Sequence, residues 1–318
     1  MYLQSIAAIV VGLVVLTWAA DKFITGAASI ARDLGVSTLV IGITIVGFGT
    51  SAPELLVSAV AALEGSRDIG IGNAIGSNIT NTTLILGASA LAAPLFVNPR
   101  VLRREIPKLL GFTAFAAALM ADGSLDRVDG LILFSIFVFS LLAPFFSRSR
   151  PEDEVLGELG EEMPEPLPLR PAILWTLAGL AALIASSWVL VWGASTAARA
   201  LGVDEVVIGL TIVAVGTSLP ELAASVAAAR KGEHDIAVGN VFGSNMFNIL
   251  AVLAMPGIVH PGETPELMME RDMSVLVAVT LLFVALVLVG GRPWRLGRWS
   301  ALVLLATYAA YTAYLFVV

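Results

Sequence analysis

The 318-residue sequence contains no cysteine and only two histidines, His234 and His260. Disulfide bonds, thiolate metal sites and cysteine nucleophiles are therefore excluded, and two histidines in predicted loops are too few for a transition-metal site. Charge is also scarce, since 14% of the residues are charged and 58% are hydrophobic. This balance lies far outside that of a soluble domain. The sequence predicts an all-α polytopic membrane protein, in which any bound metal is a hard ion held by oxygen.

Apolar segments long enough to cross a bilayer recur along the chain. A helix needs about 20 apolar residues to span the hydrocarbon core. The first segment is interpreted as a membrane helix and not as a signal peptide, because no Lys or Arg precedes it. The count predicts ten transmembrane helices, at residues 3–28, 37–63, 69–92, 104–121, 126–146, 171–200, 204–230, 236–258, 271–289 and 294–318.

The second half of the sequence repeats the first with a shift of 167 positions. The two copies align without a gap from Gly26 and Gly193 to Asn81 and Asn248. Five predicted helices per copy is an odd number, so the second copy should enter the membrane from the opposite side. We therefore expect two inverted five-helix repeats that meet near the midplane.

Residues 148–170 separate the two predicted repeats, which are residues 1–147 and 171–318 and form one integrated transport domain. The separating stretch holds seven acidic residues among several prolines, and it is predicted to be a solvated cytoplasmic acidic linker. A regulatory calcium site in this linker is an alternative interpretation. It lacks support, because the stretch has neither the Asp/Asn spacing nor the turn glycine of an EF-hand loop.

Positive charge is distributed unevenly between the two sides. With the N-terminus outside, the outer side keeps only four of the 18 Lys and Arg residues, namely Arg67, Arg127, Arg199 and Arg271. The positive-inside rule then predicts a multi-pass protein of the plasma membrane with both termini outside.

A short motif occurs twice inside the predicted helices. GTSAPE ends at Glu54 and GTSLPE ends at Glu221. Pro53 and Pro220 remove a backbone donor, and the glycine upstream loosens the helix, so backbone carbonyls should be freed there. A carboxylate near the bilayer centre costs roughly 2.5 to 3.5 kcal/mol, so two at matched positions predict a compensating cation. The alternative is that these helices only kink for packing and each Glu stays protonated or snorkels.

Hydroxyl and amide groups stand at helical spacing around both motifs. Side chains four residues apart share one helix face. If the segments converge, they form an all-oxygen cage that suits calcium, which takes about 6 to 8 oxygens, or sodium, which is of similar size. The candidate ligands are Thr50, Ser51, Glu54, Ser77 and Asn81 in the first copy, with Thr217, Ser218, Glu221, Ser244 and Asn248 in the second.

Glycines and further asparagines flank these positions. The small-residue spacing of Gly72, Gly76, Gly239 and Gly243 also predicts close helix packing, and we expect packing and ligation to coexist. The remaining asparagines are expected to tie backbone together at helix breaks, and they are Asn73, Asn78, Asn240 and Asn245.

GTSAPE with GNAIGSNITN, and GTSLPE with GNVFGSNMFN, resemble the two alpha-repeats of the calcium/cation antiporter superfamily, in its prokaryotic sodium/calcium exchanger branch. The resemblance covers the whole chain. It implies a transporter and not an enzyme, which exchanges cytoplasmic calcium for external sodium by alternating access and is electrogenic.

The resemblance also implies roles for individual residues. Glu54 and Glu221 would form the central calcium site, and the other candidate ligands would share the calcium and sodium sites. The backbone carbonyls of Gly47 and Ala214 would contribute further oxygens. The first and sixth helices would slide against the core, with close approach near Gly26 and Gly193.

One departure bears on the coupling ion. Some relatives carry Asp at a position where this chain has Asn81 or Asn248, and an acid in the second repeat is tied to potassium use. The GTS form of the motif favours sodium over protons, although a calcium/proton antiporter of the same fold stays open.

Two other classes of protein are alternative interpretations, a cation channel and an intramembrane two-acid protease. The protease has little support, because no Gly-x-Gly-Asp pattern appears. The expected partners are calcium and sodium ions and the lipid bilayer, with no cofactor, no nucleic acid and a monomeric transport unit.

Overall fold

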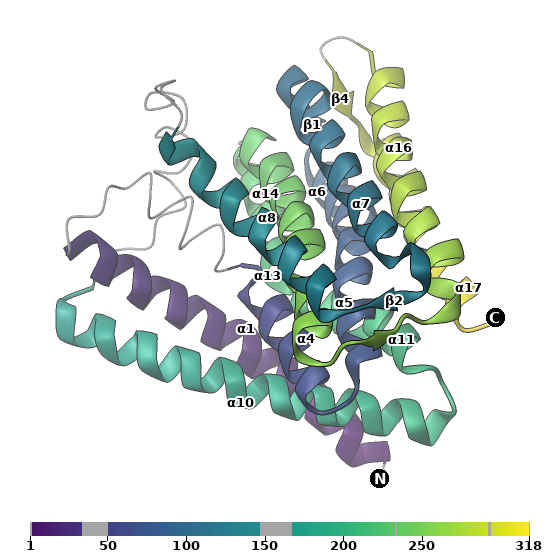
Figure 1. Cartoon of the computed structure of the whole chain (residues 1–318). Coiled ribbons are helices and arrows are strands. Elements are labelled where there is room, and N and C mark those ends of the chain that lie inside the picture. The colour runs from purple at the N-terminus through teal and green to yellow at the C-terminus, as the bar shows by residue number, and fades with distance from the viewer. Residues whose placement is uncertain (1, 34–49, 147–166, 233, 292–293, 318) are drawn as a thin grey trace.

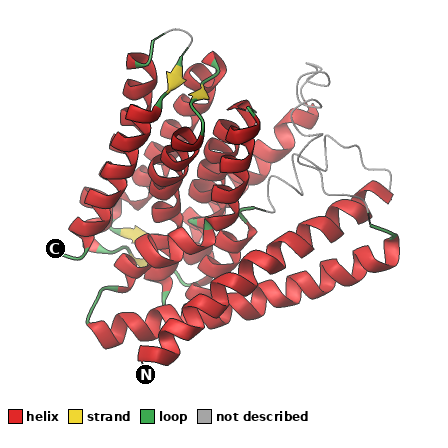
Figure 2. Cartoon of the chain, turned by 180° about the vertical axis from the view of Figure 1, so that it is seen from behind, coloured by secondary structure: helices red, strands yellow, loops and turns green. Residues whose placement is uncertain are grey.

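The computed structural model describes residues 2–33, 50–146, 167–232, 234–291 and 294–317 (Figure 1). These residues are mostly helical, which confirms the all-α prediction. Within the described ranges, the strands are four two-residue segments at the ends of the helical bundle (Figure 2). Most of the predicted linker lies outside the described residues, and α10 begins at Leu169, two residues earlier than predicted.

The first half of the chain carries the elements from α1 to α8. The turns η2 and η3 are π-helical, and η4 is a 3-10 turn. The elements are α1 (Tyr2–Asp33), α4 (Ala52–Leu63), α5 (Arg67–Thr80), η2 (Asn81–Ile85), α6 (Leu86–Ala92), β1 (Leu95–Phe96), η3 (Val101–Glu105), α7 (Ile106–Leu119), η4 (Met120–Asp122), β2 (Ser124–Leu125) and α8 (Arg127–Phe146).

The second half carries the elements from α10 to α17. The turns η5, η6 and η7 are π-helical. The elements are α10 (Leu169–Leu201), α11 (Glu205–Ile208), η5 (Gly209–Val213), α12 (Ala214–Thr217), α13 (Leu219–Lys231), α14 (His234–Phe247), η6 (Asn248–Val252), α15 (Ala254–Val259), β3 (Gly262–Glu263), η7 (Met268–Met273), α16 (Ser274–Val289), β4 (Arg295–Leu296) and α17 (Arg298–Leu315).

The boundaries of the elements follow the shift of 167 residues found in the sequence. Shifted by 167, residues 67–80 of α5 become residues 234–247, which are those of α14. The π-helical turn η2 coincides with η6 in the same way, and α1 coincides with α10 to within one residue. The repeat in sequence is therefore also a repeat in secondary structure, and it extends beyond the aligned motifs.

The strand pairs join the two halves reciprocally. Strand β1 of the first half pairs with β4 of the second, and β3 of the second half pairs with β2 of the first, both antiparallel. The two pairs lie at opposite ends of the molecule (Figure 1). Equivalent connections therefore sit on opposite sides of the bundle.

Helices α1 and α10 form a long antiparallel pair along one side of the molecule (Figure 1). Their backbones come close at glycines. A Cβ built on Gly26 would lie 2.6 Å from the carbonyl oxygen of Ala172, and one built on Gly193 would lie 3.0 Å from that of Ser5. A shift of 167 carries Ser5 to Ala172 and Gly26 to Gly193, so each contact maps onto the other. Both glycines thus mark close approach between α1 and α10 themselves, and the sliding of these helices against the core stays a prediction.

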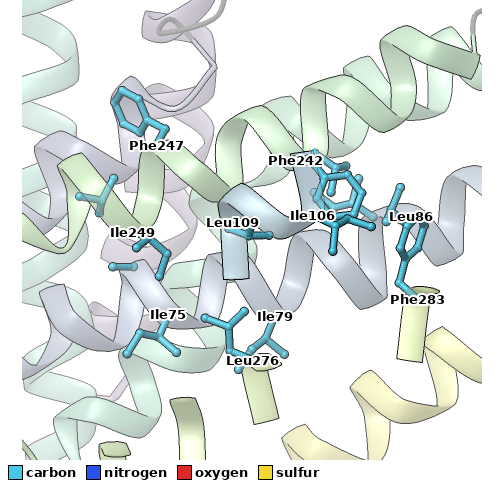
Figure 3. Packing of buried hydrophobic residues seen from close by; sticks show 14 of the residues in the cluster. Ile75, Ile79, Leu86, Ile106, Leu109, Phe242, Phe247, Ile249, Leu276 and Phe283 are labelled. Atoms are coloured by element: carbon cyan, nitrogen blue, oxygen red, sulfur yellow. The ribbon is translucent and has the colours of Figure 1, made fainter. Parts of the chain in front are cut away.

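Two hydrophobic clusters form the interior of the described chain. The larger one unites α5, α7, α14 and α16, whose side chains converge in Figure 3, with the rings of Phe242 and Phe283 at 5.1 Å between centroids. The smaller one joins α1 and α10 to α4 and to the segment around Ile208. The α1–α10 pair thus packs on the rest of the protein through its own apolar interface.

Four helices in the described part of the chain are long and apolar enough to cross a membrane, at Leu3–Ile30, Leu169–Leu201, His234–Val259 and Met268–Val289. The bent pair Glu205–Thr217 and Leu219–Arg230 could form a fifth span. These spans support a multi-pass membrane protein. The count of ten stays a prediction, since helices such as α5 carry polar residues through their middle and residues 34–49 are outside the described ranges.

Candidate cation-binding site

The two acids of the repeated motif stand at matched helix starts. Helix α4 begins at Ala52 with Pro53 in its first turn, and α13 begins at Leu219 with Pro220 in the same place. Proline fits there because the first helical N–H groups need no partner within the helix. In the second copy the chain bends by 48° between α12 and α13. The predicted break at the motif is confirmed there, and each Glu is the third residue of its helix.

Each acid is bound by a serine from the other copy of the motif. Ser51 Oγ donates to Glu221 Oε1 at 3.0 Å, and Ser218 Oγ donates to Glu54 Oε1 at 3.1 Å. Ser244 lies 3.1 Å from Ser51 and 3.4 Å from Glu221 Oε1. Both carboxylates are fully buried. The structure therefore brings the two motifs together, as predicted, and interlocks them.

The GSN segments complete the same cluster. Ser77 and Asn81 of the first half are fully buried, and Ser244 and Asn248 of the second half are 4% and 1% exposed. Asn81 and Asn248 each begin a π-helical turn, η2 and η6. Such wide turns are frequent at functional sites because they displace side chains from regular helical positions.

Six of the predicted ligands hold buried side-chain oxygens without a hydrogen-bond partner. An unpartnered buried polar atom is rare and needs an explanation. Two of these oxygens belong to carboxylates, two to amides and two to hydroxyls. They are Thr50 Oγ1, Glu54 Oε2, Ser77 Oγ, Asn81 Oδ1, Glu221 Oε2 and Asn248 Oδ1.

The charged part of the cluster is limited to the two glutamates. In the described ranges of the chain, no group of three or more His, Cys, Asp or Glu side chains could hold a metal ion. A cation held here would therefore take its remaining ligands from neutral oxygens. That donor set suits a hard ion such as calcium or sodium.

The structure describes only one of the two predicted backbone ligands, Gly47 and Ala214. Gly47 lies outside the described residues. Ala214 is the first residue of helix α12, and its carbonyl oxygen accepts from the N–H of Ser218 at 3.1 Å. Pro220 instead removes the donor that a regular helix would supply to Gly216. Because a carbonyl oxygen has a second lone pair, the role of Ala214 as a backbone ligand stays a prediction.

The remaining asparagines differ in their contacts. Asn78 does not make the predicted tie to backbone, because its side-chain nitrogen and oxygen are buried without a hydrogen-bond partner. Asn73 binds the backbone carbonyl of Glu54 at 3.1 Å, which confirms the expected tie to backbone. Asn240 donates to the side chain of Ser225, and Asn245 donates to that of Thr82, so their predicted ties to backbone are wrong.

Sequence reasoning did not show which side chains of the two halves contact each other. Asn81 Nδ2 donates to Asn245 Oδ1 at 3.0 Å, and Thr217 Oγ1 donates to Asn73 Oδ1 at 3.0 Å. The repeat pairs each of these residues with its counterpart in the other copy. The repeat does not indicate which residues of one copy contact which residues of the other.

Close helix packing is confirmed for the first pair of glycines. A Cβ on Gly72 would lie 2.5 Å from the carbonyl oxygen of Val206, and one on Gly76 would lie 2.6 Å from Leu210. Helix α5 therefore lies directly against α11 and η5. A Cβ on Gly239 or Gly243 would meet no described atom within 4 Å.

Comparison with known proteins gives consistent matches over nearly the whole chain. Residues 4–146 and 171–317 match the family model described as sodium/calcium exchanger protein. The chain is 45% identical over 310 residues to the putative antiporter CaxA of Alkalimonas amylolytica, with 97% of each chain covered. It is 31% identical over 349 residues to the sodium/calcium exchanger MaX1 of Methanosarcina acetivorans, again with 97% of each covered.

The fold is also similar to a solved structure. The sodium-calcium exchanger NCX_Mj, soaked with sodium and calcium ions, matches with a TM-score of 0.63 at 32% identity. The match covers 98% of this chain and 99% of the other.

Proposed function

The chain belongs to the sodium/calcium exchanger family and is therefore a transporter and not an enzyme, and on that premise we propose that it exchanges calcium for sodium across the membrane. Transport proceeds by alternating access and extrudes calcium from the cell. The proposal is supported above all by the six unpartnered buried oxygens of the cluster around Glu54 and Glu221. Six is the lower end of the number of oxygens that calcium takes, which is about 6 to 8.

The carboxylates are arranged to bind a cation without losing their serine contacts. In each acid the serine hydroxyl occupies Oε1 and leaves Oε2 without a partner. A calcium ion bound to both Oε2 atoms would cancel the two negative charges of the site. The neutral oxygens of Thr50, Ser77, Asn81 and Asn248 would complete its coordination, as would those of the remaining proposed ligands.

Sodium coupling rests on the amides of Asn81 and Asn248. Both are neutral, so the fixed charge of the proposed site comes from Glu54 and Glu221 alone. If about three sodium ions replace one calcium, as the resemblance to the family implies, one net charge moves in each cycle. A membrane potential then acts on the exchange with about 2.3 kcal/mol per 100 mV. The exchange is electrogenic and needs no potassium.

The proposed architecture is ten spans in two inverted repeats, with both termini outside the plasma membrane and one chain as the transport unit. It is supported by element boundaries that recur after 167 residues and by strand pairs at opposite ends of the molecule. The α1–α10 pair, which has its own apolar cluster, slides against the rest to open the site to either side.

Calcium uptake into liposomes containing the purified protein tests the proposal. We expect an outward sodium gradient, with sodium inside, to drive uptake in potassium-free medium. A gradient of potassium or of protons imposed in place of sodium should not. Strict dependence on potassium, or uptake driven by protons and indifferent to sodium, would contradict sodium coupling.

A further inference from the structure

Asn73 lies in α5, outside the set of proposed ligands, and connects the two halves of the site. Its side chain is fully buried. The amide nitrogen Nδ2 lies 3.1 Å from the backbone carbonyl of Glu54 and 3.0 Å from Ser58 Oγ. The amide oxygen Oδ1 lies 3.0 Å from Thr217 Oγ1. One side chain therefore contacts the backbone of an acid in the first half and a hydroxyl in the second.

The orientation of the Asn73 amide is fixed by its neighbours. Ser58 Oγ lies 3.0 Å from the carbonyl oxygen of Gly70, which can only accept, so the single hydroxyl hydrogen of Ser58 is used there. Ser58 and the Glu54 carbonyl then both accept from Asn73. The two N–H bonds of the amide are satisfied on this side, and its oxygen faces Thr217.

The single hydrogen of the Thr217 hydroxyl is assigned by the same reasoning. Its other neighbours are the carboxylate of Glu54 and the carbonyl of Ala214 at 3.3 Å, and that carbonyl already accepts from the N–H of Ser218 at 3.1 Å. If the hydrogen were not donated to Asn73, a fully buried amide oxygen would be left without a donor, which is energetically unfavourable. Thr217 therefore donates to Asn73.

A hydroxyl group that binds a cation must present its oxygen lone pairs and direct its hydrogen elsewhere. We propose that Asn73 is a positioning residue, which takes the hydrogen of Thr217 and so holds that hydroxyl oxygen ready to bind the transported cation. The inference rests on the proposed function, since it assumes a cation beside Glu54 and Glu221. It assigns no direct contact between Asn73 and the ion.

Asn240 is the residue of the second half that is equivalent to Asn73, and it lacks the contact with the motif of the other half. Asn240 Nδ2 donates to Ser225 Oγ at 3.1 Å, as Asn73 does to Ser58. The hydroxyl equivalent to Thr217 is that of Thr50, and its Oγ1 has no hydrogen-bond partner. Asn240 therefore keeps the local contact with serine and lacks the contact with the other motif.

The first measurement is the calcium affinity of the purified protein, determined by isothermal titration calorimetry. Asn73→Leu should weaken calcium binding by about three- to tenfold, the effect on binding of losing the bond to Thr217, which is worth about 1 kcal/mol net. Asn240→Leu should change the affinity by less than about twofold. Equal losses in the two variants would overturn the proposal.

A double-mutant cycle with Thr217 separates positioning from a general structural effect. In Thr217→Val there is no hydroxyl to orient, so adding Asn73→Leu should weaken binding by less than about twofold more. In Thr217→Ser the hydroxyl remains, and Asn73→Leu should weaken binding as much as in the wild type. A loss of the same size in all three backgrounds would show that Asn73 acts through packing alone and would overturn the proposal.

A substitute variant and a separate transport measurement distinguish this inference from the proposed calcium exchange. If Asn73→Leu does not fold, Asn73→Ala enters the same cycle, since it places no bulky group against the Glu54 carbonyl. Calcium exchange by the wild-type protein in liposomes is measured separately. If the wild-type protein shows no exchange while the mutant cycle shows the expected coupling between positions 73 and 217, only the proposed function is contradicted. Unchanged calcium binding in Thr217→Val contradicts the inference itself.

Discussion

Replacing Glu54 by glutamine changes the charge of the proposed site while keeping its shape. Glu54 Oε1 accepts from Ser218 Oγ at 3.1 Å, and the amide oxygen of glutamine can accept the same bond. The other carboxylate oxygen has no hydrogen-bond partner, so the new amide nitrogen displaces no existing contact. A buried amide without a partner costs about 1–3 kcal/mol, and we expect the variant to fold.

The loss of calcium affinity should be far larger than this cost to the fold. Removing one member of a buried ion pair costs about 3–5 kcal/mol. Because tenfold in the dissociation constant corresponds to about 1.4 kcal/mol, the Kd for calcium should rise by about two to four orders of magnitude. Glu221→Gln should have an effect of the same order, since Glu221 has the same pattern of one bonded and one unpartnered oxygen.

The assay combines calorimetric calcium binding with sodium-driven calcium uptake into liposomes. Glu64→Gln is the matched control, because Glu64 directly follows α4 and is exposed to solvent. It should bind and transport calcium like the wild type. A calcium Kd within about threefold of wild type in folded Glu54→Gln would refute the proposed site.

Topology, packing and charge transfer each give a separate test. A single cysteine at Asp122 should react with an impermeant thiol reagent from outside and one at Arg103 only from inside, and the opposite labelling would overturn the orientation. Gly76→Ala places a Cβ 2.6 Å from Leu210 and should destabilise the protein by about 1–3 kcal/mol in thermal unfolding. Stability of Gly76→Ala equal to that of the wild type would contradict the packing argument. Calcium uptake in potassium-free medium should change in rate when the membrane potential is clamped, whereas a rate indifferent to potential would contradict electrogenic exchange.

The composition of the candidate site could be predicted from the sequence because the repeat marks it twice. Glu54 and Glu221 stand beside prolines in apolar segments, where an acid without a role would be costly. The helical spacing of four residues then identified the hydroxyl and amide side chains as further candidate ligands. Spacing along one helix says nothing about how two helices face each other, so the bonds from Ser51 to Glu221 and from Ser218 to Glu54 were not predictable.

The helix geometry could be predicted only in part. Proline marks the starts of α4 and α13, because it lacks the N–H that a helix interior requires. The π-helical turns at Asn81 and Asn248 have no such local signal, since one extra residue in a turn is accommodated by packing with other helices. For the same reason the sequence did not show that helix α12 begins at Ala214 and that the Ala214 carbonyl accepts from the N–H of Ser218.

The contact between α1 and α10 has the form of an isologous dimer interface. Gly26 meets the residue equivalent to Ser5, and the residue equivalent to Gly26 meets Ser5 itself. In a symmetric dimer of identical chains one such substitution alters both contacts at once. Here the two contacts are encoded separately in a single chain, so one can change while the other is kept. This separation lets the two halves diverge, as they do where Asn73 reaches across to Thr217 and Asn240 has no matching bond to Thr50.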